Sequence, residues 1–191
     1  PVPLPDGWKP KSFSLAGYNF ARGFAAAMRG KIEEAKKYLN EIQAIREKGL
    51  HENYFKRVEY LQVWELEIQT AIKLFEKDFK AAIKLSKQAI LLEEQLPAPS
   101  GPPRILKPSY ELLGEVYLKA GKPIQAYEKF STSLLRHPNR IRSLVGAARA
   151  ANLKGDREVA IENYRQIIKQ FKNANSELPE LNEARMFLAV K

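Results

Sequence analysis

The sequence of 191 residues contains no cysteine. The chain therefore has no disulfide, no thiol nucleophile and no thiolate ligand for a metal. It also lacks any stretch of about eighteen uncharged apolar residues, the length that a membrane-spanning helix requires. We therefore expect no membrane span. Because cysteine-free proteins occur on both sides of a membrane, both the cytoplasm and an exported location stay open.

Motifs of the common catalytic and cofactor sites are missing as well. The two histidines, His51 and His137, have no HExxH motif or histidine-rich tract around them, so a zinc site is not expected. No phosphate loop, GxGxxG or GxSxG motif occurs. Neighbouring carboxylates such as Glu33 and Glu34 point about 100° apart on a helix, which disfavours paired acid–base chemistry. We expect a non-catalytic protein without a cofactor.

Positive charge is in excess, with a formal net charge of +10. Such a surplus attracts nucleic acid, anionic lipid or acidic proteins when it is concentrated on one face. Lys and Arg alternate with Glu in almost every helical stretch, as in residues 31–48 and 154–170. This interleaving predicts solvated helix faces. Binding of nucleic acid or another polyanion is the alternative function, and the interleaving disfavours it.

One local pattern recurs four times, a turn element followed five residues later by alanine. The turns begin at Gly30, Lys77, Gly121 and Gly155. Apolar residues at spacings of three and four flank each turn, which predicts two amphipathic helices joined tightly. Glycine suits the left-handed backbone at the end of the first helix. Because one helical hairpin cannot bury its apolar stripes alone, the hairpins are expected to stack.

Residues 107–140 resemble the tetratricopeptide repeat (TPR). Its pattern is Trp-x2-Leu-Gly-x2-Tyr, then Ala-x3-Phe, then Pro. The corresponding residues are Tyr110, which replaces the Trp, and Leu113, Gly114, Tyr117, Ala126, Phe130 and Pro138, which match. Residues 141–174 follow as a degenerate copy, and the two earlier pairs match less closely. The resemblance implies an all-α fold, a right-handed α-solenoid of about four antiparallel helix hairpins with a C-terminal capping helix.

The expected boundaries form one repeat domain over residues 12–191, preceded by an extended proline-rich segment at 1–11. They are hairpins at 12–48, 52–95, 107–138 and 139–173, a proline-rich crossing at 96–107 and a capping helix at 177–190. More weakly, the chain is similar to the C-terminal part of bacterial TPR proteins of unassigned function. That similarity, and the start at Pro1 without Met, predict an upstream part of a longer polypeptide.

Several residues carry sharper local predictions. Gly114 costs about 1 kcal/mol of helix propensity relative to alanine, which predicts a tight helix contact there. Asn139 and Ser176 are predicted N-caps. The aromatic residues near the N-terminus, Trp8, Phe13, Tyr18, Phe20 and Phe24, either pack in the first hairpin or covered an upstream repeat.

The stretch "LPAPSGPPRILKPSY" at residues 96–110 contains five prolines. Pro97 can stop the outgoing helix, and Pro108 suits the first turn of the incoming one. We predict an ordered crossing that keeps the second and third hairpins stacked, with Ile105 and Leu106 packed against them. A linker between independent domains is the other interpretation, and it would need a capping helix before the crossing.

The predicted function follows from the TPR resemblance, because the first helix of each TPR hairpin lines an inner groove. The predicted partner-binding residues are Trp64, Glu67, Glu111, Glu115, Lys119, Arg142, Arg149 and Asn152. Aromatic anchors with separated charges suit an extended peptide or a partner helix. Arg142 and Arg149 can each clamp a carboxylate bidentately. We expect a scaffold module that binds another protein, or an upstream domain of its own polypeptide; plain packing or solvent exposure is the alternative for each residue.

Overall fold

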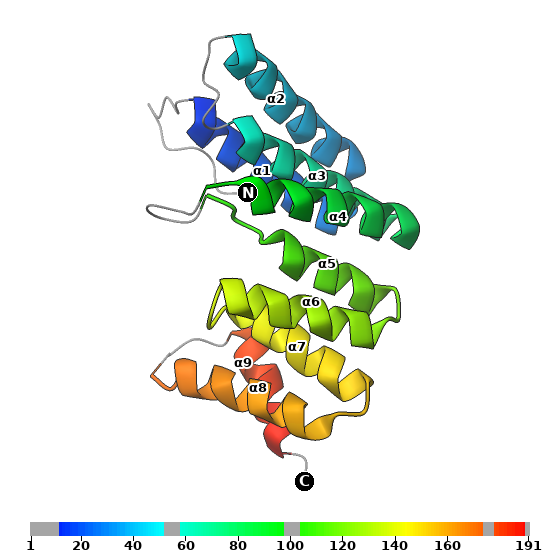
Figure 1. The fold of residues 1–191 in the computed structure, drawn as a ribbon, viewed down its shortest axis with the longest axis vertical. Helices are drawn as coiled ribbons and strands as arrows, with labels where there is room; N and C mark the ends of the chain where they lie inside the picture. Colours follow the sequence, from blue (N-terminus) through cyan, green and yellow to red (C-terminus); the bar gives the residue numbers. More distant parts are fainter. Residues whose placement is uncertain (1–11, 52–57, 98–103, 174–177, 190–191) are drawn as a thin grey trace. The chain divides into compact units, whose positions relative to one another are not determined.

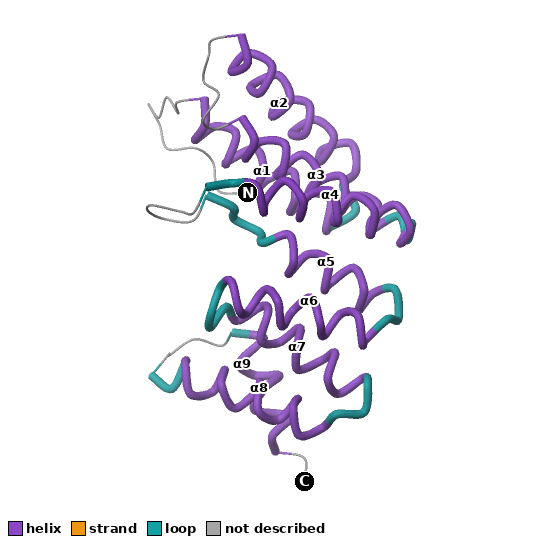
Figure 2. Tube along the Cα trace, viewed as in Figure 1, coloured by secondary structure: helices purple, strands orange, loops and turns teal. Residues whose placement is uncertain are grey.

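The computed structural model describes residues 12–51, 58–97, 104–173 and 178–189 (Figure 1). Every regular element in these ranges is an α-helix and none is a strand, which confirms the predicted all-α class (Figure 2). The helices are α1 (Ser12–Met28), α2 (Ile32–His51), α3 (Val58–Phe75), α4 (Phe79–Gln95), α5 (Ser109–Lys119), α6 (Pro123–Arg136), α7 (Ile141–Leu153), α8 (Arg157–Gln170) and α9 (Pro179–Ala189). Among the described residues, no helix combines the length and apolar character needed to cross a bilayer.

The chain divides into two compact units, Pro1–Ile105 and Leu106–Lys191. In the first unit α1 packs along α2, α3 packs along α4, and α3 also contacts both α1 and α2. In the second unit each helix from α5 to α8 packs on the next, α8 packs on α9, and α7 also contacts α5 and α9. Each unit therefore buries the apolar stripes of its hairpins against a neighbouring helix.

Aromatic side chains form much of the core of the first unit. Phe20 stacks on Trp64 with ring centroids 5.5 Å apart, and Phe13 lies 5.2 Å from the same indole. Phe20 also contacts Phe24. These residues pack within the first unit, but Phe13 and Phe20 contact Trp64 of the second predicted hairpin and are not confined to the first. Trp8 lies outside the described residues.

A notch made by two glycines holds Phe130 in the second unit. A Cβ added to Gly114 on α5 would lie 2.9 Å from the fully buried Phe130 ring, and one added to Gly146 on α7 would lie 2.3 Å from it. Both distances are shorter than van der Waals contact. The tight contact predicted at Gly114 is confirmed, and Gly146 contributes the other wall of the notch.

The turns follow the predicted backbone pattern. Gly30, Gly121 and Gly155 have φ values of 76°, 69° and 90°, and Lys77 takes the same left-handed conformation at 60°. After Gly121, the Lys122 N–H donates back to the Tyr117 carbonyl at 2.9 Å. This hydrogen bond satisfies a carbonyl at the helix end.

Two predictions of local structure are wrong. Asn139 does not cap α7: it adopts a left-handed φ of 64°, and its side-chain oxygen accepts from Gln166 on α8 at 2.9 Å. Arg140 instead precedes the helix. Leu106 is 48% exposed, because the chain turns there and directs the next side chain, Lys107, inward. The other predicted cap, Ser176, lies outside the described residues.

The end of the proline-rich crossing is shared between the units. Ile105 packs against the core of the first unit, and the Arg104 guanidinium lies over the rings of Phe13 and Tyr60. Lys107 is buried in the second unit, and Pro108 immediately precedes α5. The unit boundary falls between residues 105 and 106. Stacking of the second hairpin on the third stays a prediction.

Candidate interaction surface

Three of the eight predicted groove residues are buried within their units. Trp64 is 2% exposed in the aromatic core, and Glu67, on the same helix, is fully buried. Glu111 on α5 is fully buried as well. The reason is that α1 lies against α3 and α7 lies against α5, so these positions face a neighbouring helix. In this structure none of the three is available to a partner.

Glu111 is the centre of an ionic cluster that sequence reasoning missed. Its carboxylate accepts from Lys107 Nζ at 2.8 Å, from Arg140 Nε at 2.7 Å and from Ser143 Oγ at 2.7 Å. Lys107 also donates to Glu115 Oε1 at 2.6 Å, so the predicted groove residue Glu115 is bound by a side chain of its own unit. Arg140 donates in addition to the Leu106 carbonyl at 3.2 Å. The cluster fastens the start of the second unit to α5 and α7.

Electrostatics keep the buried Glu111 charged. Burial alone would raise the pKa of its carboxyl, but the Lys107 charge and the hydrogen bonds from Arg140, Lys107 and Ser143 outweigh burial and lower the pKa to about 2. Both carboxylate oxygens of Glu111 accept hydrogen bonds, which is the condition for burying a carboxylate without a large loss of stability. The only sequence signal was the i, i+4 spacing of Lys107 and Glu111.

The other four predicted residues are exposed. Lys119 lies at the end of α5, and Arg142, Arg149 and Asn152 lie on α7. Residues seven and ten positions apart return to about the same side of a helix, so the three α7 residues share one exposed face. Arg142 makes no hydrogen bond or ion pair with any described residue. The structure thus places three of the eight predicted groove residues on one exposed face, in the second unit.

Arg149 already binds a carboxylate. Its Nε donates to Glu183 Oε1 of α9 at 2.8 Å and its Nη2 donates to Glu183 Oε2, a bidentate pair. The Tyr164 hydroxyl on α8 donates to the same carboxylate at 2.7 Å. The hydrogen bonds from Arg149 lower the pKa of Glu183, and burial together with the Glu183 hydrogen bond raises the pKa of Tyr164. The predicted bidentate chemistry is present, with a carboxylate of the chain itself.

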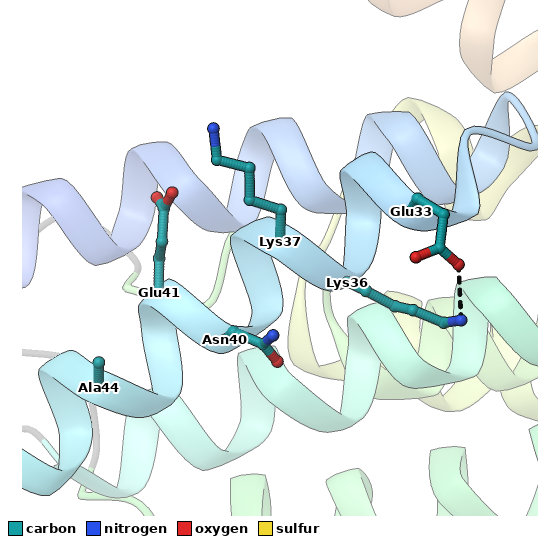
Figure 3. Close-up of a pocket in the computed structure, with 6 residues that line it drawn as sticks. All are labelled: Glu33, Lys36, Lys37, Asn40, Glu41 and Ala44. Carbon is teal, nitrogen blue, oxygen red and sulfur yellow. Dashed lines mark hydrogen bonds and ion pairs between the residues drawn. The ribbon is translucent and has the colours of Figure 1, made fainter.

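A shallow hollow lies on the surface of α2. All six lining residues belong to this one helix: Glu33, Lys36, Lys37, Asn40, Glu41 and Ala44 (Figure 3). Lys36 donates to Glu33 at 2.8 Å, and the other polar tips spread apart along the helix. Nor do three or more His, Asp or Glu side chains gather as a metal site would require in the described ranges. The exposed face of α7 is therefore the better candidate surface.

Comparisons with protein-family models, curated proteins and solved structures give no match to the chain. A function has to come from the residues and geometry of the chain itself. Two surfaces stand out by their charge. One is the exposed face of α7, and the other is the face of α4 that carries the exposed Lys80, Lys84 and Lys87.

Proposed function

We propose that the second unit is a non-catalytic, TPR-like interaction module that binds an acidic segment of a partner protein through the exposed face of α7. The observation that carries this proposal is the bidentate grip of Arg149 on the Glu183 carboxylate. The same face presents Arg142 and Asn152, and Lys119 is exposed at the end of α5. A carboxylate-recognising geometry therefore stands beside a second exposed guanidinium.

The packing inside the second unit supports the TPR-like part of the proposal. Phe130 and Gly114 fill the positions that the TPR pattern assigns to a ring and a small residue, and the Phe130 ring would lie 2.9 Å from a Cβ added to Gly114. Ala126 and Ala160, each five residues after its turn glycine, are fully buried between helices. We propose further that all four hairpins stack into a right-handed α-solenoid.

The charge of α7 favours an acidic partner. The helix, "IRSLVGAARAANL", has no Asp or Glu, and among the described residues Arg149 pairs with Glu183 of α9 whereas Arg142 pairs with none. A guanidinium offers two parallel N–H donors, which match a carboxylate and add specificity as well as energy. The partner is a separate protein or an upstream part of the same polypeptide; the chemistry of recognition is the same in both cases.

The test uses Arg142→Glu in the full chain, because Arg142 has no bonded partner among the described residues and its loss leaves the Arg149–Glu183 pair intact. Partners are captured on the purified chain and identified by mass spectrometry, and each one is then titrated. We expect reversal of this charge to weaken the genuine partner by about tenfold or more, equivalent to about 1.4 kcal/mol. Arg165→Glu, an exposed charge reversal on α8, is the matched control and leaves that affinity unchanged.

Retention of every partner by Arg142→Glu contradicts the proposal. The nucleic-acid alternative makes a different prediction, measured by titrating single-stranded DNA at several salt concentrations. It requires an affinity for the DNA that falls linearly with the logarithm of salt concentration, with a slope that becomes shallower when a contacting cation is reversed.

A further inference from the structure

The outer face of α4 carries a row of lysines that ends in a leucine. Lys80, Lys84, Lys87 and Leu91 recur at i, i+4, i+7 and i+11, the spacing of one side of an α-helix. All four side chains are exposed, and Leu91 is 60% exposed. We call this row of four residues the α4 stripe. It belongs to the first unit, whereas the α7 surface belongs to the second.

The positive charge of the α4 stripe is not neutralised within the described residues. No Asp or Glu occurs from Phe79 to Leu92, and the carboxylate of the preceding Asp78 accepts the Ala81 N–H at 3.0 Å as the N-cap. None of the three lysines forms a hydrogen bond or an ion pair with a described residue. Elsewhere in the unit exposed lysines do pair: Lys36 binds Glu33 at 2.8 Å. The alternation of Lys or Arg with Glu that is found in most helical stretches is therefore absent from this part of α4.

We propose that the α4 stripe docks an acidic amphipathic helix of a partner protein. The lysines follow one another at a rise of about 6 Å and about 4.5 Å, the same intervals at which Glu residues recur on one side of a second helix laid alongside. Three carboxylates at those intervals meet the three ammonium groups. An apolar residue of the partner, one turn further on, packs on Leu91 and removes it from water.

Leu91 is the reason for choosing a protein rather than a nucleic acid. It continues the lysine row in register, so any ligand that follows the row reaches it. A phosphate backbone offers charge along its whole length and nothing apolar for an exposed leucine, whereas a helical peptide places an apolar side chain one turn beyond its acidic ones. The proposal is independent of the α7 surface, and either can fail without the other.

The experiment titrates the full chain with a fluorescein-labelled helical peptide of about fifteen residues. The peptide carries Glu at i, i+4 and i+7 and Leu at i+11, and a scrambled peptide of the same composition is the ligand control. At low salt we expect the triple variant Lys80→Glu/Lys84→Glu/Lys87→Glu to bind the peptide at least about tenfold more weakly, since three ion pairs become three repulsions. Leu91→Ser is expected to weaken binding about threefold.

A matched control exists on α8 and just after its end, where three exposed cations have the same i, i+4, i+7 spacing. They are Arg165, Lys169 and Lys172. Reversal of these three changes the net charge by the same amount and is expected to leave the affinity for the peptide within about twofold. Equal loss in the two triple variants overturns the proposal, because net charge alone then explains binding.

Three further results also overturn it. One is equal affinity for the scrambled peptide, and another is no binding of the designed peptide at all. The third is tighter binding of single-stranded oligothymidylate that the α4 triple variant loses and Leu91→Ser does not, which would identify a nucleic-acid surface instead. If the triple variant does not fold, Lys84→Glu alone is compared with Lys169→Glu under the same criteria.

Discussion

Replacing Glu111 by glutamine tests the ionic cluster that begins the second unit. The amide keeps the shape of the side chain but removes the charge and places an NH2 group among donors, since Lys107, Arg140 and Ser143 all donate to the carboxylate. Lys107 is itself buried and, among the described residues, keeps Glu115 as its acceptor. The substitution therefore leaves a buried ammonium group poorly compensated.

The magnitude follows from the pKa of the carboxyl. A pKa of about 2 in place of the ordinary 4.5 corresponds to about 3 kcal/mol of stability at neutral pH. Removing one member of a buried ion pair costs about 3–5 kcal/mol in other proteins, so the two estimates agree. Because the pKa is lowered on folding, this stability is complete above pH 4.5 and is lost as the pH falls toward 2.

Hydrogen exchange followed by mass spectrometry is the suitable assay, because it reports on the amides of α5 and α7 directly, whereas Trp64 lies in the first unit. Amides of α5 and α7 are expected to exchange about 100-fold faster in Glu111→Gln at neutral pH. Exchange in α3 is expected to be unchanged. Glu128→Gln, an exposed carboxylate on α6, is the control and should have no effect.

Two results would refute this reasoning. The first is a loss below about 1 kcal/mol, which is the cost of one ordinary hydrogen bond. The second is a difference between wild type and Glu111→Gln that stays constant from pH 5 down to about pH 2, because a charged carboxylate has to lose its advantage as it is protonated.

Two other substitutions test the packing and the turns. Gly146→Ala places a Cβ 2.3 Å from the Phe130 ring and should destabilise the second unit by about 1–3 kcal/mol despite the better helix propensity of alanine; hydrogen exchange in α7 measures the loss, and the double variant with Phe130→Leu should recover part of it. Lys77→Gly should stabilise the first unit by about 1 kcal/mol, because Lys77 has a φ of 60° where the other three turns have glycine. Urea unfolding followed by tryptophan fluorescence measures this gain, and an unchanged midpoint would contradict it.

Much of the fold could be predicted from local patterns. Apolar spacing indicated the helices, and glycine at 121 and 155 indicated left-handed turns, because both depend on a few neighbouring residues. The cap at Asn139 was wrong because a side chain on α8 competes for its oxygen, a contact with a residue 27 positions away. The prediction that Leu106 packs inward was wrong for a related reason. Lys107 turns inward in its place because Glu111 and Glu115 accept its hydrogen bonds.

The candidate site was less predictable than the fold. Groove positions were assigned by register, and register does not say which neighbour covers a side chain. Trp64 and Glu111 are buried because another helix lies over them. Arg142 and Asn152, which were assigned to the groove by the same register, are exposed. The pairing of Arg149 with Glu183 joins residues 34 positions apart and has no local signal in the sequence.

The sequence by itself determined the all-α class, the places of the tight turns and the need for small residues at Gly114, since hydrophobic period, backbone φ and side-chain volume are local properties. Only the tertiary structure decided which charges are buried in pairs and which face the solvent. Whether a charge is neutralised depends on distance in space, so the cluster around Glu111 and the unpaired lysines on α4 become distinguishable only when the helices are packed.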